Sequence, residues 1–289
     1  MIPREMVTLM ERRRLVAEVR TETAIQALGV VDALAAAGVT TIEVSLTIPG
    51  AQEILGHVAV RQDVLVGAGA VLDARQAAEA ISCGARFIAS PICAPDLINP
   101  CREANVACIL GALTPSEIIA AQRAGAEMVK LFPAEALGGP MYVRALFRQL
   151  THLSLQVSGG FTAENMTEYL QLPVRTLGLG TLLVPRVLVE NGNWQAITNR
   201  AKAFVDFVAN PHVNAARFLA MMGIAPRPKP APGPVEPQIA VSAVPTMPTP
   251  PSVAAAMSAS QPGVAPASSG FRPWDSRPVE MGDDEDWLR

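Results

Sequence analysis

The feature that most restricts the fold of this chain is the repeated order of its first 210 residues, in which short apolar segments alternate with amphipathic ones. Short apolar segments bounded by turn residues are typical of buried strands, and apolar residues at a helical period are typical of connecting helices. Eight strands are predicted, at residues 15–20, 41–46, 64–69, 86–91, 107–113, 128–133, 154–160 and 176–181. Eight such units in ~200 residues predict an α/β fold of the (β/α)8 TIM-barrel type.

Two of the intervening segments show how the helices are expected to end. "TAIQALGVVDALAAAG" and "DARQAAEAISCG" each finish on a glycine, which suits the position that follows the last turn of a helix. In barrels of this kind the carboxyl ends of the strands and the loops after them carry the chemistry. A functional site is therefore expected at that end.

The composition of the chain changes after residue 210. Residues 211–270 are rich in proline, alanine and serine, which remove backbone donors and bury little area, so this segment is predicted to be a disordered linker. Residues 271–289, "FRPWDSRPVEMGDDEDWLR", regain aromatic and acidic residues. They are interpreted as a short linear motif for a protein partner, or else as a remnant without one. Residues 1–210 form the predicted barrel.

Charge and cysteine content narrow the function classes. The net charge is −3 and no stripe of lysine and arginine alternates with aromatic residues, so nucleic acid is not an expected partner. No segment has the ~18 apolar residues of a membrane span, and the charged N-terminus does not fit a signal peptide, which predicts a cytoplasmic protein. Four cysteines lack the spacing of a metal or redox site and are expected to be reduced, at Cys83, Cys93, Cys101 and Cys108.

A lysine within an apolar strand is the strongest functional signal. "EMVKLFPAE", residues 127–135, places Lys130 on the sixth predicted strand, and Glu43 lies on the second. These strands face each other across the barrel, and even-numbered strands donate side chains to the same layer. Lys130 and Glu43 could form a buried ion pair that only neutralises two charges. Alternatively, desolvation lowers the pKa of Lys130, and its neutral amine condenses with a carbonyl while Glu43 moves the protons.

The second interpretation corresponds to class I aldolase chemistry. An amine that condenses with a ketone gives a cationic imine, which withdraws electrons and allows an adjacent carbon–carbon bond to break. The last two strands add a predicted phosphate site, because "VSGGFTAEN" and "GLGTLL" place Gly159, Gly160, Gly180 and Thr181 directly after them. The alternative is that these glycines are ordinary turn residues.

These motifs together resemble a known family over residues 8–209. The blocks "GVTTIEVSLTIPGA", "GALTPSEIIAAQRAGAEMVKLFPAEALGG" and "VSGGFTAEN" are similar to those of bacterial aldolases that cleave 2-keto-3-deoxy-6-phosphogluconate (KDPG), many of which also act on 4-hydroxy-2-oxoglutarate (KHG). The resemblance implies that Lys130 forms the imine, Glu43 is the acid and base, and Arg20 holds the substrate carboxylate. It further implies a substrate-binding role for four residues, Thr47, Pro91, Phe132 and Ser158. The family is typically a homotrimer that needs no metal or organic cofactor.

The chain departs from the family pattern at several positions. "GAGA" replaces the usual GAGT, so Ala70 lacks a hydroxyl, and "VSGG" replaces PTGG, with Val157 and Ser158. Glu18 stands where an apolar residue or proline is usual, and Thr47 stands where some members have arginine and others threonine. A lost hydroxyl that leaves a buried partner unpaired costs ~1–3 kcal/mol, so efficiency or substrate preference is expected to have drifted.

The leading prediction is an aldolase that releases pyruvate, either from KDPG with glyceraldehyde 3-phosphate or from KHG with glyoxylate. Alternatives are a related imine-forming lyase, such as an oxaloacetate decarboxylase, and a non-catalytic trimeric scaffold that displays the tail. The apolar loop segments "IASPICAPDLINPC" and "EALGGPMYV" also favour a homotrimer, because a monomer would expose them.

Overall fold

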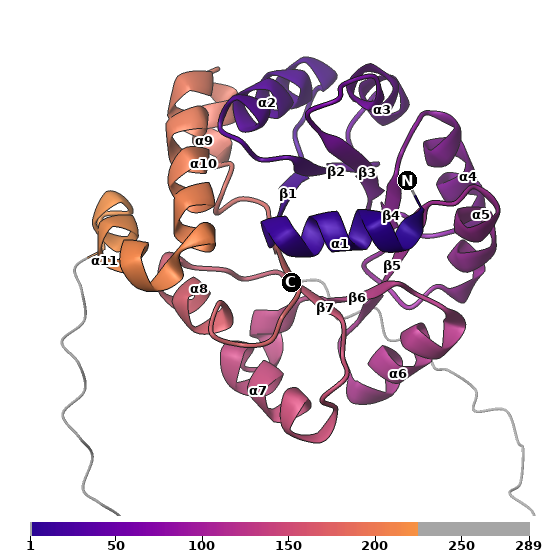
Figure 1. The fold of residues 1–289 in the computed structure, drawn as a ribbon. Coiled ribbons are helices and arrows are strands. Elements are labelled where there is room, and N and C mark those ends of the chain that lie inside the picture. The colour runs from indigo at the N-terminus through magenta and orange to yellow at the C-terminus, as the bar shows by residue number, and fades with distance from the viewer. Residues whose placement is uncertain (1, 225–289) are drawn as a thin grey trace, which may run out of the picture. The chain divides into compact units, whose positions relative to one another are not determined.

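The computed structural model describes residues 2–224 and confirms the (β/α)8 prediction. Eight parallel strands close into one barrel in sequence order (Figure 1). They are β1 (Leu15–Val19), β2 (Thr41–Ser45), β3 (Leu65–Gly69), β4 (Phe87–Ala89), β5 (Ala107–Ala112), β6 (Met128–Leu131), β7 (Leu155–Ser158) and β8 (Thr176–Leu179). Each lies within its predicted segment. The motif at 271–289 and the linker from residue 225 onward lie outside the described residues.

A ring of helices surrounds the strands (Figure 1). It comprises α2 (Ala24–Ala36), α3 (Ala51–Ala59), α4 (Ala74–Ser82), α5 (Ile98–Glu103), α6 (Pro115–Ala124), α7 (Gly139–Gln149), α8 (Ala163–Tyr169), α9 (Arg186–Glu190) and α10 (Trp194–Ala209), with 3-10 turns at Pro95–Leu97 and Ala134–Leu137. Thr23, Asp73 and Thr114 begin three of these helices by accepting a hydrogen bond from a backbone N–H of the first turn. Gly38 and Gly84 follow α2 and α4 with positive φ, as the predicted C-terminal caps require.

The N-terminal helix α1 (Pro3–Arg13) closes one end of the barrel. It crosses the ring of strands in Figure 1, and Met6 and Met10 are fully buried. These methionines pack into a cluster inside the barrel with side chains that include Phe87 and Ile109. The remaining apolar strand side chains pack outward against the helices. Because α1 closes the amino-terminal end of the strands, the barrel interior opens at their carboxyl ends.

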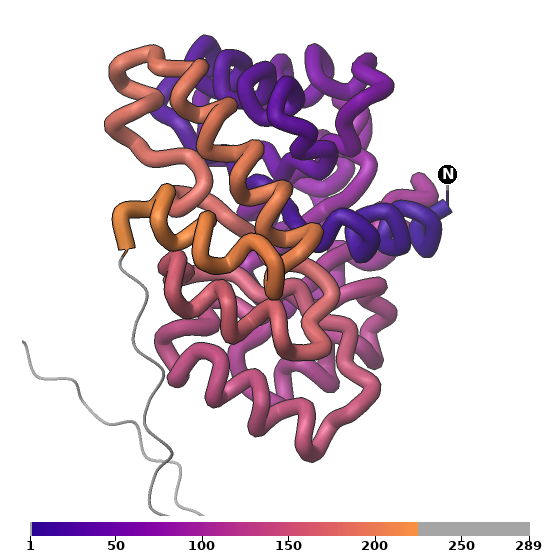
Figure 2. The backbone as a smooth tube through the Cα atoms, turned by 60° about the vertical axis from the view of Figure 1, so that its left-hand side comes forward, coloured from indigo at the N-terminus to yellow at the C-terminus, as the bar shows by residue number. Residues whose placement is uncertain are grey.

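The folded unit extends beyond the predicted boundary at residue 210. Residues Pro211–Met221 form a further helix, α11, which runs beside α10 (Figure 2). Phe218 of α11 is buried, stacks on Phe207 at 4.1 Å between ring centroids and meets Phe204 edge-on at 4.9 Å. The prediction that the linker begins at residue 211 is therefore wrong for 211–224. Pro211 occupies the first turn of a helix, where no N–H donor is needed, and so does not mark disorder.

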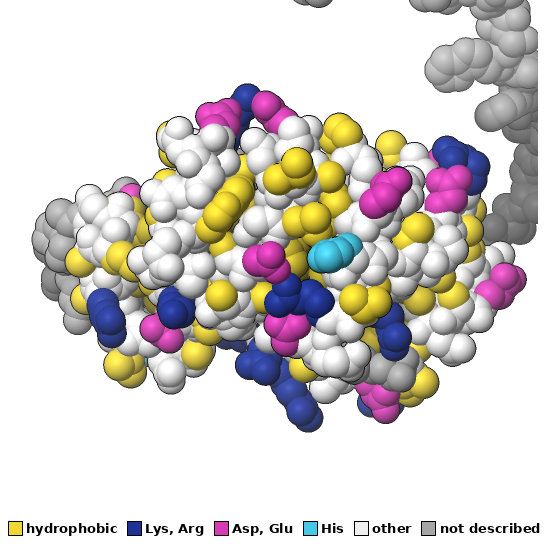
Figure 3. Space-filling model, turned by 90° about the horizontal axis from the view of Figure 1, so that it is seen from above, with side chains coloured by type: hydrophobic (Ala, Val, Ile, Leu, Met, Phe, Trp, Pro, Cys, Tyr) yellow, Lys and Arg dark blue, Asp and Glu magenta, His cyan; other side chains and the backbone are white. Residues whose placement is uncertain are grey.

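The surface shows mixed charge on the face viewed in Figure 3, where basic side chains lie beside acidic ones and hydrophobic side chains are scattered. Among the described residues, Arg61 forms ion pairs with Asp32 and Asp63. Within residues 2–224, no helix is long and apolar enough to cross a membrane. Cys101 and Cys108 are buried, Cys83 and Cys93 are half-buried, and all four thiols are free.

Candidate active site

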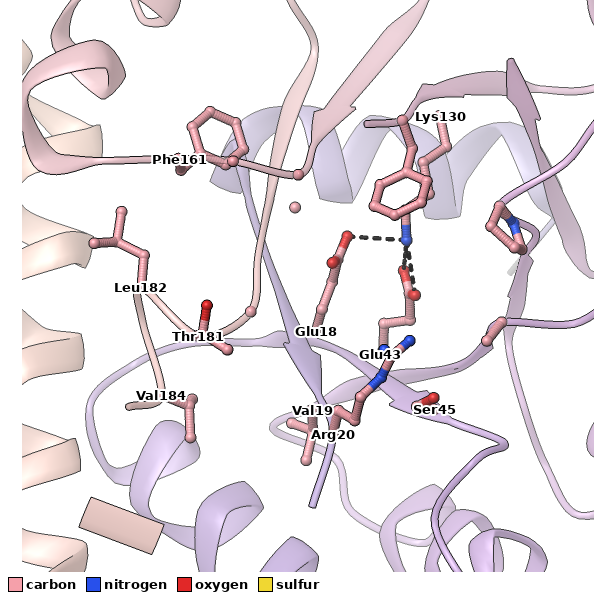
Figure 4. A pocket seen from close by; sticks show the side chains of 17 residues that line it. Glu18, Val19, Arg20, Glu43, Ser45, Lys130, Phe161, Thr181, Leu182 and Val184 are labelled. Atoms are coloured by element: carbon pink, nitrogen blue, oxygen red, sulfur yellow. Dashed lines mark hydrogen bonds and ion pairs between the residues drawn. The ribbon is translucent and has the colours of Figure 1, made fainter. Parts of the chain in front are cut away.

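A cavity of about 300 Å³ opens at the carboxyl ends of the strands (Figure 4). This volume is at the lower end of the range for small-ligand pockets, ~300–1,000 Å³. Nine of the eleven residues predicted for the site line it, namely Arg20, Glu43, Pro91, Lys130, Phe132, Gly159, Gly160, Gly180 and Thr181. Segments that lie far apart in the sequence therefore meet at one cavity, as the (β/α)8 prediction requires.

Lys130 and Glu43 are in direct contact inside the barrel. Lys130 Nζ lies 2.9 Å from Glu43 Oε1 and 3.1 Å from Glu43 Oε2, and each residue is only 5% exposed. Gly69 on β3 makes room for the carboxylate, because a Cβ added there would lie 2.0 Å from Glu43 Oε1. The predicted convergence of β2 and β6 on one layer is confirmed.

A second carboxylate, from Glu18 on β1, also contacts the lysine. Glu18 Oε1 lies 2.9 Å from Lys130 Nζ and accepts a 2.7 Å hydrogen bond from the Ser158 hydroxyl on β7. Figure 4 shows both carboxylates directed at the same nitrogen. Gly178 on β8 leaves space for Glu18, since a Cβ there would lie 2.2 Å from Glu18 Oε1. The sequence marked Glu18 as a departure from the family pattern but assigned it no role.

The two carboxylates reverse the predicted pKa shift of the lysine. Burial alone lowers the pKa of Lys130, but Glu43 and Glu18 together outweigh it, and the pKa lies above its ordinary value. The expectation of a lowered pKa is therefore wrong for this arrangement, because it counted desolvation without two anions in contact with Nζ. Burial also raises the pKa of Glu43, against the opposing effect of Lys130, to about 6. The lysine is an ammonium at neutral pH, and Glu43 is its adjacent proton acceptor.

The loop after β7 forms the wall where the phosphate site is predicted. Gly159 and Gly160 both have positive φ, at 88° and 87°, which favours glycine. Glu135 holds this loop: its N–H donates to Gly159 O at 3.3 Å, and its carboxylate accepts hydrogen bonds from Asn165 and Tyr169. Asn165 also donates to Gly160 O at 3.2 Å. The "KLFPAE" and "GGFTAEN" segments thus form one hydrogen-bonded unit rather than two separate motifs.

Two predicted substrate-binding residues lie outside the cavity lining. Thr47 is exposed two residues beyond the end of β2, and its hydroxyl lies 2.8 Å from that of Ser45, which lines the cavity instead. Ser158 is fully buried, and its hydroxyl donates to Glu18 rather than facing the opening. Alternation along β2 directs Glu43 and Ser45 inward, whereas Thr47 falls where the strand has ended.

Gln156 is a further buried polar residue that the sequence did not indicate. It pairs in register with Lys130, is fully buried, and its side-chain amide acts on the Glu43 carboxylate as a hydrogen-bond donor that lowers the pKa of Glu43. Its Nε2 and Glu18 Oε1 border the same space above Gly178. The buried polar side chains therefore include Gln156 on β7 as well as the charged groups of Glu18, Glu43 and Lys130.

Comparison with known proteins identifies the family. The family model described as KDPG and KHG aldolase matches residues 6–200. The chain belongs to this family. The 2-dehydro-3-deoxy-phosphogluconate aldolase of Pseudomonas aeruginosa is 33% identical over 192 residues, which are 66% of this chain and 87% of that protein. The KHG/KDPG aldolase of Escherichia coli is 34% identical over 176 residues, which are 60% of this chain and 82% of that protein.

A solved structure supports the same assignment. KDPG aldolase from Legionella pneumophila, in which pyruvate is captured as a covalent carbinolamine intermediate, has a TM-score of 0.64 and 29% identity, and the match covers 68% of this chain and 97% of that one. KDPG and KHG aldolases are class I, Schiff-base enzymes. The protein is therefore a lyase of the aldolase type, and the family match ends before α11 and the C-terminal residues.

Proposed function

We propose that this aldolase cleaves KDPG to pyruvate and glyceraldehyde 3-phosphate, KHG to pyruvate and glyoxylate, or both, through an imine on Lys130. The observation that carries the proposal is the contact between Lys130 Nζ and Glu43, 2.9 Å apart at the base of an open cavity. A nucleophile and a proton acceptor within hydrogen-bond reach are what imine formation requires. The names of the Pseudomonas and Escherichia relatives support the choice of substrates.

The chemistry starts with a proton transfer from the Lys130 ammonium to Glu43. The neutral amine then attacks the C2 carbonyl of the substrate, and the carbonyl oxygen leaves as water after Glu43 returns protons to it. Glu43 next accepts the proton of the C4 hydroxyl as the C3–C4 bond breaks, and the bonding electrons move onto the imine to give an enamine. Protonation at C3 and hydrolysis release pyruvate. The imine itself is the electron sink, so the route uses no metal or organic cofactor.

Other cavity residues orient the substrate. Arg20 follows β1 at the cavity lining and forms no ion pair within residues 2–224, so its guanidinium is available for the substrate carboxylate. Gly159, Gly160, Gly180 and Thr181 line the wall where the far end of the substrate lies, and their backbone N–H groups are the proposed partners of a phosphate or second carboxylate. Phe132 and Pro91 supply apolar lining.

A substrate comparison tests the assignment. Pyruvate release from KDPG, KHG and oxaloacetate would be followed with lactate dehydrogenase under identical conditions. The proposal expects cleavage of KDPG or KHG to exceed oxaloacetate decarboxylation in kcat/KM. Decarboxylation with negligible aldol cleavage would instead support the related imine-forming lyase, and no turnover with any substrate would support the scaffold.

We further propose that the protein is a cytoplasmic homotrimer. Ile92, Leu137 and Met141 lie in the two apolar segments at residues 88–101 and 135–143 and are 48%, 46% and 79% exposed in the single chain. Exposed apolar side chains of this size are typical of interfaces between subunits. Light scattering at micromolar concentration should return a trimer. A monomer under those conditions would contradict this part of the proposal.

A further inference from the structure

Glu18 contacts the nitrogen on which the proposed chemistry takes place. Its carboxylate lies as close to Lys130 Nζ, at 2.9 Å, as that of Glu43 does. The site around it is built for a carboxylate, because Ser158 donates a hydrogen bond to Glu18 Oε1 and Gly178 leaves the space that the side chain fills. A chance exposed acid would have neither feature.

The charge on Lys130 Nζ is the same at the start and at the end of imine formation. The ammonium carries three protons; two leave with the carbonyl oxygen as water, and one stays on the protonated imine. The nitrogen is therefore cationic in both states, whereas the group that moves the protons must change charge between them. A permanent counter-ion and a proton carrier are two different tasks, and two carboxylates are present.

The surroundings of the two carboxylates fit different tasks. The Glu43 side chain is 6% exposed, and burial raises its pKa to about 6, which suits a group that gains and loses a proton near neutral pH. The Glu18 side chain is 22% exposed, accepts the Ser158 hydrogen bond and lies 2.9 Å from Lys130 Nζ, so solvent, a hydroxyl donor and the lysine nitrogen all face its carboxylate.

We propose that Glu18 is a second catalytic carboxylate, which stays ionised against Lys130 and holds the positive charge of its nitrogen, first as ammonium and then as protonated imine, while Glu43 moves the protons. Ser158 is its positioning residue. This inference rests on the proposed imine chemistry and assigns a role to one of the residues at which the chain departs from its family's pattern.

The proposal has a specific consequence for pH dependence. The titratable and charged groups that line the cavity are Glu18, Arg20, Glu43 and Lys130. The negative charge of Glu18 raises the pKa of both Glu43 and Lys130. In the reactive enzyme one of the two groups, Glu43 or Lys130, holds the transferable proton. Activity measured as kcat/KM is therefore lost below the pKa of Glu43, where both groups are protonated, and above the pKa of Lys130, where neither is. Removing the charge of Glu18 must move both limits to lower pH.

The experiment compares kcat/KM between pH 4.5 and 10.5 for the wild type, Glu18→Gln, Ser158→Ala and a control, Glu22→Gln, with borohydride trapping of pyruvate in parallel. Glu22 is 65% exposed and pairs with Arg186 outside the cavity lining, so its variant should reproduce the wild-type profile. Glu18→Gln should shift the acid limb, which Glu43 sets, acid-ward by ~1–3 pH units, the range for a charge within ~4–6 Å. The alkaline limb of the wild type lies above the measured range, because the pKa of Lys130 is raised, and in Glu18→Gln it should move toward that range. Ser158→Ala should shift the acid limb in the same direction by less.

Each outcome decides the proposal. A folded Glu18→Gln protein with wild-type limbs, alongside a wild type that traps pyruvate, would overturn the role of Glu18 while leaving the proposed function intact. A wild type that traps no pyruvate would overturn both. If Glu18→Gln does not fold by circular dichroism, Glu18→Val, which also removes the charge, and Ser158→Ala decide, and a wild-type pH profile in both would contradict the assignment.

Discussion

Replacing Gly69 by alanine should inactivate the enzyme without unfolding it. Gly69 ends β3, and its φ is not positive, so alanine fits the backbone. The added Cβ would lie 2.0 Å from Glu43 Oε1, whereas ordinary contact begins at 3.4 Å, so the carboxylate must move by more than 1 Å. A misplacement of ~1 Å can cost ~100-fold in rate, and complete loss of a positioned acid and base costs ~10,000-fold at most. We therefore expect kcat to fall by ~100- to 10,000-fold.

Gly67→Ala is the matched control for this change. Gly67 lies on the same strand, and its added Cβ would lie 2.4 Å from the ring of Phe87, in the closed half of the barrel. Overpacking of either site should cost ~1–3 kcal/mol, which lowers Tm by ~2–12 °C in a protein of this size. Turnover would be measured by pyruvate release and Tm by circular dichroism. The reasoning is refuted if Gly69→Ala is folded and retains turnover within tenfold of wild type, or if Gly67→Ala loses as much.

Because burial, with a contribution from Glu18, raises the pKa of Glu43 to about 6, kcat/KM of the wild type should fall as pH drops below ~6, and a profile flat to pH 5 would contradict that assignment. Lys130→Met should abolish turnover and lower stability by ~3–5 kcal/mol in urea unfolding, because the buried carboxylate of Glu43 and the partly exposed carboxylate of Glu18 lose their counter-charge. Unchanged stability would argue against the ion triad. Truncation after Ile224 should leave turnover within about twofold of wild type and abolish the capture of any partner that binds through residues 271–289. Truncation after Asn210 should destabilise the fold, because it removes the buried Phe218.

The barrel was predictable because its signals are local and repeated. Each strand is a short apolar segment followed by a turn, and eight of them in alternation with helices leave few other topologies. The helix α1 was not predicted, because its charged residues mask the apolar face that places Met6 and Met10 inside the barrel. The helix α11 was not predicted because Pro211, at its first position, was interpreted as the start of the proline-rich linker.

The candidate site was predictable where a family motif or strand parity fixed the direction of a side chain, as for Lys130 and Glu43. The role of Glu18 was not, because a single acid on a strand does not show which strands will surround it. Its meaning depends on Gly178 and Ser158, which lie far along the chain and leave space and donate a hydrogen bond only in the closed barrel. The predicted direction of the Lys130 pKa shift was wrong for the same reason, because the sequence did not show that the Glu18 carboxylate contacts Lys130.

The central claim, that Lys130 forms the imine, is tested most directly by reducing the protein with borohydride in the presence of pyruvate and mapping the modified peptide by mass spectrometry. The sequence offers an internal control, because Lys202 lies exposed on α10 and Lys229 follows the described residues. We expect a three-carbon adduct on Lys130 alone, and none in Lys130→Ala. An unmodified Lys130, or an adduct distributed over Lys202 and Lys229, would contradict the account.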